Sequence, residues 1–432
     1  MACRSVQPGR HYGCPVPGSM GNHAKAAAAR PAGSGGAKSM RAGWKPFIIA
    51  ISTVCLCLLS GCWDRKEMDE LALVMASGVD LAEDGQIEVT LQIAIPTGIP
   101  GTLQSGGKEK KPVEVISAKG EAGFEIIGKL QQQLSRRLFF GHRAVFVVGE
   151  TYARNSIDQT LDVLIRLPDS RHNCYILTTQ GTTAKEVLTS PYHMEFIPAI
   201  GMKNIQSGDF SVGVKIDEFM ADLSIEGKMP VTGAISLIRS GNENTFQIDQ
   251  AAIYRDTMLV GYLSGAELKA YKMIMDGAHN LMVTVKVESQ HAKTKGTVSA
   301  EILKGGSRVR TFWRNGMPQI EVFYHATARI TNNDSTLDLS KSNNLLRAES
   351  ELSDEVQNAI ERMIDKLQHE FKADALGFGT LFHQQHPQVW KQLKSQWNDR
   401  YPEARVDVKA RIRIERMGRT EAPGPLESEE VR

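Results

Sequence analysis

The stretch SNNLLRAESELSDEVQNAIERMIDKLQHEFKADA, residues Ser342 to Ala375, decides the fold of the last third of the chain. Its apolar residues recur in steps of three and four, which places them on one face of an α-helix. They are Leu352, Val356, Ile360, Met363, Leu367 and Phe371. A long helix with one apolar stripe needs a surface to cover, so we expect it to lie across a β-sheet. Gly377 and Gly379 are expected to end it.

Strand patterns stand on both sides of this helix. Four runs before it are rich in β-branched residues and are separated by Gly or polar turns. They span 281–289, 297–305, 307–315 and 319–331. After it, a short helix is expected to begin at Pro387, and the alternating run 404–418 forms a last strand. The outer face of that strand carries Arg405, Asp407, Lys409, Arg411 and Arg413. The pattern predicts an antiparallel sheet packed against the long helix.

The first half of the body alternates strand and helix signals. Strands are predicted at 87–96, 113–120, 144–150 and 173–181, and helices at 121–138 and 157–168. The helix at 121–138 is predicted from the stripe of Phe124, Ile127, Leu130, Leu134 and Leu138. Because strands that alternate with helices form sheets covered by helices, we expect α/β layers here.

The whole chain is therefore predicted to be a mixed α+β and α/β protein of several domains. Its 432 residues are enough for two or three domains. The predicted divisions are an N-terminal α/β domain at 62–205, a connector or small middle domain at 206–250, a sheet-plus-long-helix domain at 251–418 and a disordered tail at 419–432.

The segment that precedes the body has the pattern of an exported lipoprotein. After Met40, the basic residues Arg41 and Lys45 are followed by the apolar run PFIIAISTVCLCLLS, residues 46–60. This run is short for a membrane span and fits the apolar part of a signal peptide. Residues 59–62, Leu-Ser-Gly-Cys, resemble the lipobox of bacterial lipoproteins. The alternatives are a plain signal anchor, or an ordinary cleavage site with an incidental cysteine.

If residues 59–62 are a lipobox, residues 40–61 are a signal peptide that is cut between Gly61 and Cys62. The thiol of Cys62 then takes a diacylglycerol, and its new amino group is a site for N-palmitoylation. Two acyl chains suffice for stable attachment to a membrane. Residues 1–39 are rich in Gly, Ala and Pro without periodicity, so we interpret them as a non-native or disordered extension. The start codon at Met1, Met20 or Met40 stays open.

Charge and cysteine usage support the same division of the chain. Residues 1–61 contain seven Lys or Arg and no Asp or Glu, which is typical of a targeting segment. The body lacks the basic block that nucleic-acid binding needs, so we expect no nucleic-acid partner. Five of the six cysteines lie at or before Cys62, which leaves Cys174 alone in the body. One thiol makes neither an internal disulfide nor a structural zinc site.

The body contains no sequence motif that predicts catalysis. There is no GxSxG elbow and no phosphate-binding glycine loop. His383 and His386 have metal-ligand spacing but no evident third ligand, so we interpret them as solvated helix-start residues. His142 precedes a buried strand and is interpreted as a buried polar anchor or a partner contact. We expect no catalytic residue, no cofactor and no metal, and therefore no enzyme.

Several blocks resemble one bacterial family. The stretch from Leu58 to Asp80, LLSGCWDRKEMDELALVMASGVD, is similar to the mature start of the Ger(x)C spore-germination lipoproteins. The pattern is carried by Cys62, Trp63, Asp64, Arg65, Glu67, Gly78 and Asp80. Further blocks at 135–150, 164–181, 251–267, 371–397 and 406–418 follow in the family's order, with Pro387, Trp390 and Trp397 at family positions.

The resemblance implies a C subunit of a nutrient germinant receptor. Such a subunit is anchored by its lipid to the outer face of the inner spore membrane, beside integral-membrane A and B subunits. It is needed to trigger germination and has no established catalytic activity. Whether it binds the germinant directly, and which germinant this is, stays open. The candidate contact residues are Trp63, Asp64, Arg65, His142, Trp390 and Trp397. The alternatives from other classes are a lipid-anchored extracytoplasmic solute-binding protein and an anchored hydrolase.

Overall fold

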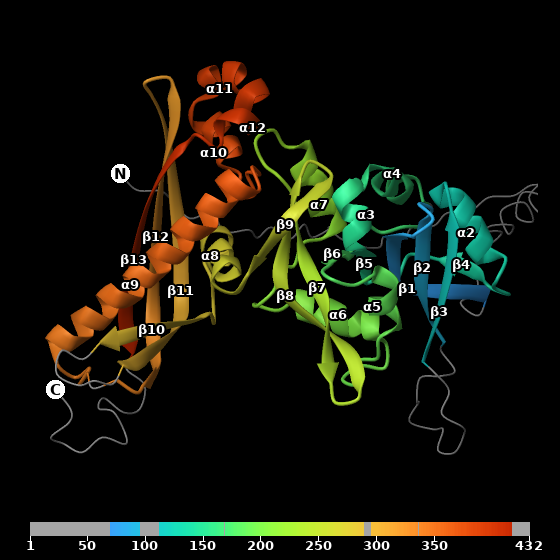
Figure 1. Cartoon of the computed structure of the whole chain (residues 1–432), viewed down its shortest axis with the longest axis horizontal. Helices are drawn as coiled ribbons and strands as arrows, with labels where there is room; N and C mark the ends of the chain where they lie inside the picture. The colour runs from blue at the N-terminus through green and yellow to red at the C-terminus, as the bar shows by residue number, and fades with distance from the viewer. Residues whose placement is uncertain (1–69, 96–111, 168, 289–294, 336, 417–432) are drawn as a thin grey trace, which may run out of the picture. The chain divides into compact units, whose positions relative to one another are not determined.

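The computed structural model describes residues 70–95, 112–167, 169–288, 295–335 and 337–416 (Figure 1). The predicted extension 1–39, signal peptide 40–61 and tail 419–432 lie outside these ranges. Within them, the strands form two sheets, and helices cover both. This is the mixed α/β fold class that the sequence predicts, so that prediction is confirmed.

The first sheet has nine strands among the described residues, in the order β3-β2-β1-β5-β6-β7-β8-β9, with β4 paired to β1. Strands β1, β5, β6 and β7 are parallel neighbours, and antiparallel strands extend the sheet on both sides. The strands are β1 (Leu71–Leu81), β2 (Ile87–Ala94), β3 (Val113–Gly120), β4 (Arg137–Phe139), β5 (Val145–Val148), β6 (Tyr175–Thr179), β7 (Val231–Ser240), β8 (Glu243–Arg255) and β9 (Met258–Ser264).

Helices pack on both faces of this sheet, as α/β layers require. On one face lie α3 (Glu150–Asn155), α4 (Asp158–Arg166) and α7 (Ile216–Ser224), and on the other α5 (Ala184–Thr189) and α6 (Pro198–Gln206) (Figure 1). The β5 strand supplies both cores: Phe146 and Val148 contact the first layer, and Val145 and Val147 the second. All four side chains are buried because the strand is covered on both sides.

The divisions drawn at 205 and 250 stay a prediction about independent domains. Strand β7 ends before residue 250, β8 crosses it and β9 follows it. All three strands belong to the first sheet, which therefore continues past the division drawn at 250. Within the described ranges, no helix combines the length and the apolar character that a membrane crossing needs.

The helix predicted at 121–138 is only half present. Helix α2 spans Gly123–Gln131, and residues Arg137–Phe139 form β4 instead. This short strand pairs with the start of β1, so a tertiary contact overrides the helical pattern. The buried residues of α2 are Ile126 and Leu130, whereas Phe124 is 46% exposed. The buried face of α2 is therefore rotated by part of a turn from the face that was predicted, so the predicted stripe was wrong.

The second sheet has the order β10-β11-β12-β13 and is antiparallel in its first three strands. The strands are β10 (Met282–Glu288), β11 (Lys295–Arg314), β12 (Met317–Asn333) and β13 (Arg405–Arg416), and α8 (Gly265–Met275) links the two sheets in sequence. Strand β13 pairs parallel to β12 because the long helix forms the crossover between them.

Three strands replace the four that were predicted before the long helix. The runs 297–305 and 307–315 are one strand, β11, and Gly305-Gly306 lies inside it and makes no turn. Gly305 is required for a close approach: an added Cβ would overlap the Gly277 carbonyl oxygen and the Tyr324 hydroxyl. Glycine within a strand often marks such a close approach of another backbone.

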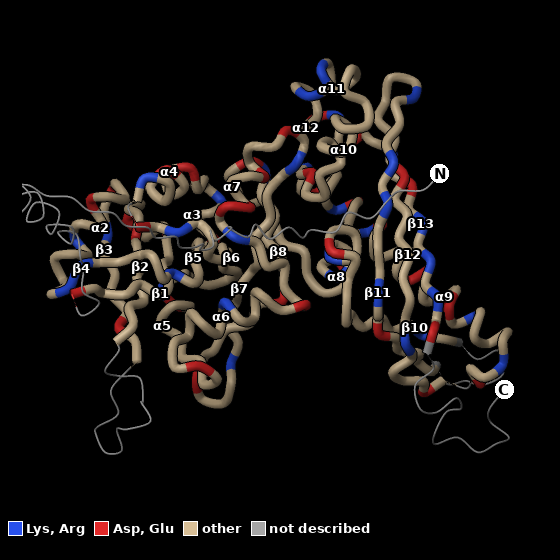
Figure 2. Tube along the Cα trace, turned by 180° about the vertical axis from the view of Figure 1, so that it is seen from behind, with Lys and Arg blue, Asp and Glu red and all other residues tan. Residues whose placement is uncertain are grey.

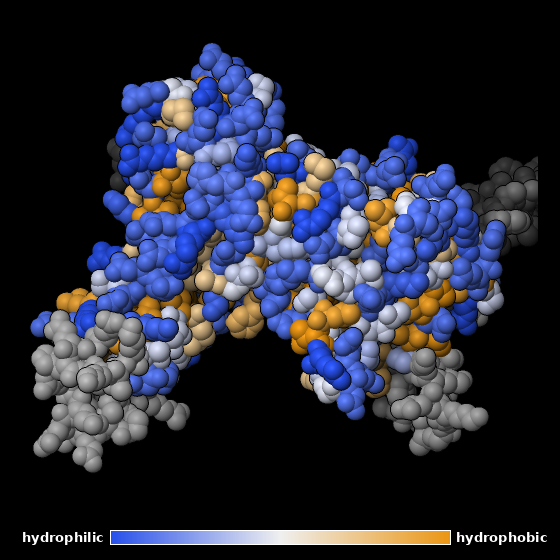
Figure 3. Space-filling view, viewed as in Figure 1, coloured by the Kyte–Doolittle hydropathy of each residue, from blue (hydrophilic) through white to orange (hydrophobic). Residues whose placement is uncertain are grey.

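The long helix α9 spans Ser342–Asp365 and continues as a π-helical turn over Lys366–Glu370. All six residues of the predicted stripe are buried, and α9 runs along the second sheet (Figure 1). Its outward surface is hydrophilic (Figure 3). The helix ends earlier than Ala375 because Lys372 takes a left-handed backbone conformation, with φ of 50°. Gly377 instead begins the next helix, α10 (Phe378–Gln385).

Helix α9 also covers the open edge of β13. The backbone N–H of Ile412 donates to Ser353 Oγ at 2.9 Å, and that of Ile414 donates to Glu349 Oε1 at 2.7 Å. An edge strand presents unpaired donors that invite association with other strands. Two polar side chains on the sheet-facing side of the helix satisfy these donors.

Replacing Gly305 by Ala is expected to lower the free energy of unfolding by about 1–3 kcal/mol, because the new Cβ forces backbone apart. Gly306→Ala is the matched control from the same strand. Its Cβ would stand 3.3 Å from the His325 ring, a side chain that has room to adjust. Urea denaturation of both variants measures the difference. Equal stabilities would contradict the close-approach role of Gly305.

Candidate functional site

The residues predicted to carry the lipid anchor lie outside the described ranges. These are Gly61 and Cys62, together with the contact candidates Trp63, Asp64 and Arg65. The anchor therefore stays a prediction from the sequence.

His142 is exposed, so its interpretation as a buried anchor was wrong. Its ring lies edge-on to Phe139, with 5.7 Å between the centroids. The role of partner contact stays a prediction for this residue. The neighbouring Arg143, which the sequence analysis passed over, is the buried member of the pair at 5% exposure.

Trp390 and Trp397 are buried at 1% and 2% exposure, so neither indole is available as an exposed contact. That prediction was wrong because these residues form the core of a helical cap over the second sheet. The cap consists of α10, α11 (Pro387–Leu393), a 3-10 turn (Lys394–Gln396) and α12 (Trp397–Arg400). The two indoles are 5.4 Å apart, centroid to centroid.

The cap holds the loop that leads into β7. Trp390 Nε1 donates to Glu226 Oε2 at 3.1 Å, and Lys394 Nζ donates to Glu226 Oε1 at 2.9 Å. These two donors hold the pKa of the Glu226 carboxyl below its ordinary value. Gly227, at φ of 81°, lies so close to Gly379 and Trp390 that a Cβ would stand 2.6–2.7 Å from their atoms. The loop and the cap are thus fitted to each other.

Asp374 is the buried carboxylate at the centre of the cap. It accepts hydrogen bonds from the backbone N–H of Phe378 at 3.0 Å and of Gly379 at 2.7 Å, and from Trp397 Nε1 at 3.0 Å. Its backbone oxygen accepts from Met229 N at 2.9 Å. Burial raises the pKa of the Asp374 carboxyl to about 6, against the opposing effect of these donors.

His383 and His386, which have metal-ligand spacing, each contact a neighbouring residue of the protein. His386 Nε2 lies 2.7 Å from the Thr311 carbonyl oxygen, and the His383 ring stacks on Trp390 at 5.7 Å. In the described part of the chain, no group of three or more His, Cys, Asp and Glu residues could hold a metal ion. Cys174 is buried and has no disulfide partner there.

Gly78 and Asp80, two residues of the family pattern, have packing roles at the end of β1. A Cβ on Gly78 would stand 2.9 Å from the Ala184 Cβ. Asp80 accepts hydrogen bonds from the backbone N–H of Ala184 at 2.8 Å and of Lys185 at 2.9 Å. The carboxylate thereby satisfies the first free donors of α5, so this pair fixes α5 on the sheet.

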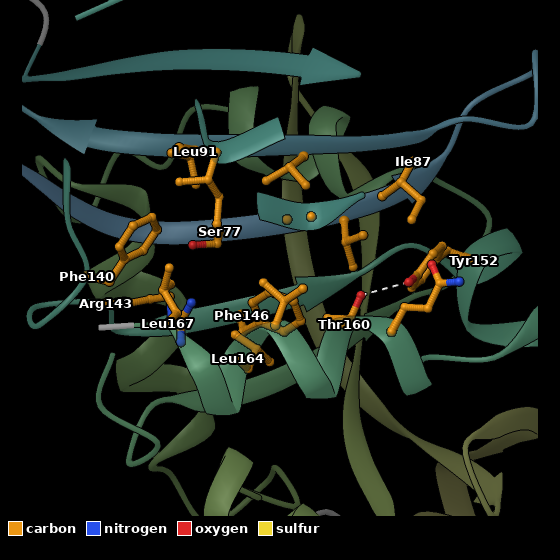
Figure 4. Close-up of a pocket in the computed structure, with 17 residues that line it drawn as sticks. Ser77, Ile87, Leu91, Phe140, Arg143, Phe146, Tyr152, Thr160, Leu164 and Leu167 are labelled. Atoms are coloured by element: carbon orange, nitrogen blue, oxygen red, sulfur yellow. Dashed lines mark hydrogen bonds between the residues drawn. The ribbon is translucent and has the colours of Figure 1, made fainter. Parts of the chain in front are cut away.

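A cavity of about 60 Å³ lies between the first sheet and the α2–α4 side (Figure 4). Strands β1 and β2 supply Ser77, Val79 and Leu91, and α4 supplies Val163 and Leu164. Most of the remaining lining is apolar, and comprises Gly78, Ile87, Val89, Gly123, Ile127, Phe140, Arg143, Phe146, Tyr152, Gln159, Thr160 and Leu167. It combines an apolar wall with a few polar groups, which is the usual character of a small-molecule site.

The basic face predicted for the last strand is present. Arg405, Asp407, Lys409, Arg411 and Arg413 are all exposed on β13 (Figure 2). Arg405 pairs with Asp407 at 3.2 Å. This strip is an exposed surface of mainly positive charge.

The Asp374 carboxyl gives a pH prediction. The folded protein keeps its proton to about pH 6, whereas the unfolded chain loses it near pH 4. The free energy of unfolding of the wild type, relative to Asp374→Asn, is therefore expected to fall by up to about 3 kcal/mol as the pH rises from about 4 to 6.5.

Urea titrations at a series of pH values measure this difference. Asp354→Asn is the matched control, since it removes an exposed carboxyl on α9 by the same substitution. A flat difference for Asp374→Asn would contradict a raised pKa.

The fold and sequence together define a class of spore germination protein. Residues 64–237 match the spore germination protein N-terminal domain, and residues 249–418 match the spore germination B3/GerAC-like C-terminal domain. The chain belongs to this family, and a role in spore germination follows.

Individual relatives support the assignment over nearly the full length. The chain is 28% identical to spore germination protein KC of Bacillus subtilis, over 87% of this chain and 96% of that protein. It is 23% identical to spore germination protein B3 of the same organism, over 83% and 94%. The crystal structure of the GerBC protein covers 82% of this chain and 100% of its own, with a TM-score of 0.51 and 20% identity, and so has the same fold.

Proposed function

We propose that this protein is the lipid-anchored, non-catalytic C subunit of a nutrient germinant receptor. The observation that carries the proposal is a lipobox, residues 59–62, placed two residues before the start of the matched family domain. The body would then stand at the outer face of the inner spore membrane. Its contribution to triggering would come from contacts with integral-membrane A and B subunits.

The surfaces open to such contacts differ from those first expected. The buried Trp390 and Trp397 are no longer candidates, whereas the basic outer face of the last strand, the strip on β13, is exposed and stays one. Such a strip favours a partner surface or a lipid surface of negative charge. His142 and the segment Trp63–Arg65 stay candidates from the sequence.

The alternative of a solute-binding protein requires two α/β lobes that face a cleft. The second sheet carries a single long helix and a helical cap, which is a different architecture from the first sheet. The receptor-subunit proposal fits both halves of the chain.

Cys62→Ala is expected to abolish lipid attachment, because the cleavage site then has no thiol on which a thioether to the diacylglycerol can form. Intact mass spectrometry of the membrane-extracted protein should show a wild-type chain that begins at Cys62 and carries a diacylglyceryl mass. The matched control is Cys57→Ala, which removes a thiol within the apolar run and should leave the mature mass unchanged.

An unmodified wild-type chain that retains residues before Cys62 would contradict the anchor. The run 46–60 would then be a short membrane anchor. The family assignment of the body would stand, because it rests on residues 64–418.

A further inference from the structure

Arg143 is a buried cation without an acidic partner in the part of the chain that the structure describes. Its side chain donates from Nη2 to Ser170 Oγ at 2.8 Å, and its guanidinium lies 5.4 Å from the Phe146 ring and 5.9 Å from the Phe140 ring. Its Nε is buried and has no hydrogen-bond partner there. A buried charge is costly unless it is paired, and the described side chains supply no anion for Arg143.

The guanidinium lines the apolar cavity beneath α4, and a second unsatisfied polar group lines it too. Ser77 is 3% exposed, and its Oγ has no partner among the described residues. Figure 4 shows the Ser77 hydroxyl directed toward the end of the cavity where Arg143 lies. At the other end, Tyr152 and Thr160 bond to each other at 2.8 Å, so that pair is satisfied.

The remaining polar groups define what the cavity accepts. No acidic side chain is among its lining residues, so an ammonium group would be buried there without a counter-charge. A carboxylate, unlike an ammonium group, would find partners there. The planar guanidinium offers N–H donors that suit it, and Ser77 offers a hydroxyl. The apolar wall, which includes Val79, Leu91 and Val163, suits a hydrocarbon chain.

Size limits the ligand to a few heavy atoms. A water needs about 10–15 Å³, so a cavity of about 60 Å³ takes roughly four to six groups of that size. A carboxylate with two or three further carbons has five or six heavy atoms and fits this range. The cavity is therefore too small for a nucleotide or a hexose without rearrangement.

We propose that this cavity is a binding site for a short apolar monocarboxylate, held by Arg143 and Ser77 through its carboxylate. The class of ligand follows from charge, shape and size, and it excludes zwitterionic amino acids of the same length. The inference goes beyond the receptor-subunit role and does not depend on the lipid anchor. Loss of the anchor would leave this site intact, and an empty site would leave the anchor intact.

The test is isothermal titration calorimetry of the full mature chain in detergent, with propionate, butyrate and isobutyrate as probes. Isobutyramide removes the charge from isobutyrate, and 2-aminoisobutyrate adds an ammonium group to it. We expect saturable binding of at least one monocarboxylate, with affinity at least about tenfold weaker for the amide and for the zwitterion.

Two variants assign the contacts. Arg143→Gln removes the charge and is expected to weaken binding about 10- to 100-fold. Ser77→Val fills the same end of the cavity with an apolar group, leaves the arginine in place and is expected to abolish binding. Arg166→Gln is the matched control, because Arg166 lies exposed on α4 and pairs only with Asp162 at 2.8 Å among the described residues.

Each outcome of these titrations either supports the binding site or overturns it. Loss of binding in Ser77→Val, with a wild-type melting temperature, supports the site even if Arg143→Gln fails to fold. Binding that survives Ser77→Val, equal affinity for the amide and the acid, or no binding of any of the three acids at millimolar concentration would each overturn the proposal.

Discussion

The burial of one face of helix α9 is the interaction on which the rest of the structure depends. Along its length the helix covers the second sheet and satisfies the edge of β13 through Glu349 and Ser353. At its end, Lys366 Nζ donates to the Tyr262 carbonyl oxygen of β9 at 3.1 Å and pairs with Glu267 of α8 at 2.9 Å. The same element therefore closes one sheet and contacts the last strand of the other. Phe371 occupies the space that a side chain at Gly261 would need.

The helical cap makes a second connection of the same kind. Asp374, two residues after the turn that ends the helix, bonds to Met229 through its backbone oxygen and holds Trp397 and the start of α10 through its carboxylate. The aromatic residues that match the family pattern thus stabilise the contact between loop and cap, as Gly78 and Asp80 stabilise α5 on the first sheet. These residues hold the helices in place, and the proposed contacts with other subunits would fall to exposed features such as the β13 strip.

The sequence predicts most of the fold because periodicity reports which face of an element is buried. The α9 stripe, the alternating β13 strand and the burial of β5 all follow from it. Long-range contacts decided the rest: pairing with β1 turned the end of a helical pattern into β4, and the Gly277 carbonyl explains why Gly305 continues a strand. The burial of Trp390 and Trp397 was missed for the same reason. At the candidate site, the burial of Arg143 could not be predicted from the run GHRAVFVV, Gly141 to Val148, because arginine is rarely buried. Arg143 and Ser77 line the same cavity although 66 residues separate them, and no local sequence pattern predicts that.

We propose that this protein is a scaffold whose function lies in what it holds together at a membrane. Cross-linking in isolated inner spore membranes, followed by purification of a tagged chain and protein identification, tests this claim most directly. We expect two integral-membrane subunits to be recovered with the chain in comparable amounts. A lipid-modified chain that is recovered alone, under cross-linking that captures other membrane complexes in the same sample, would contradict the account.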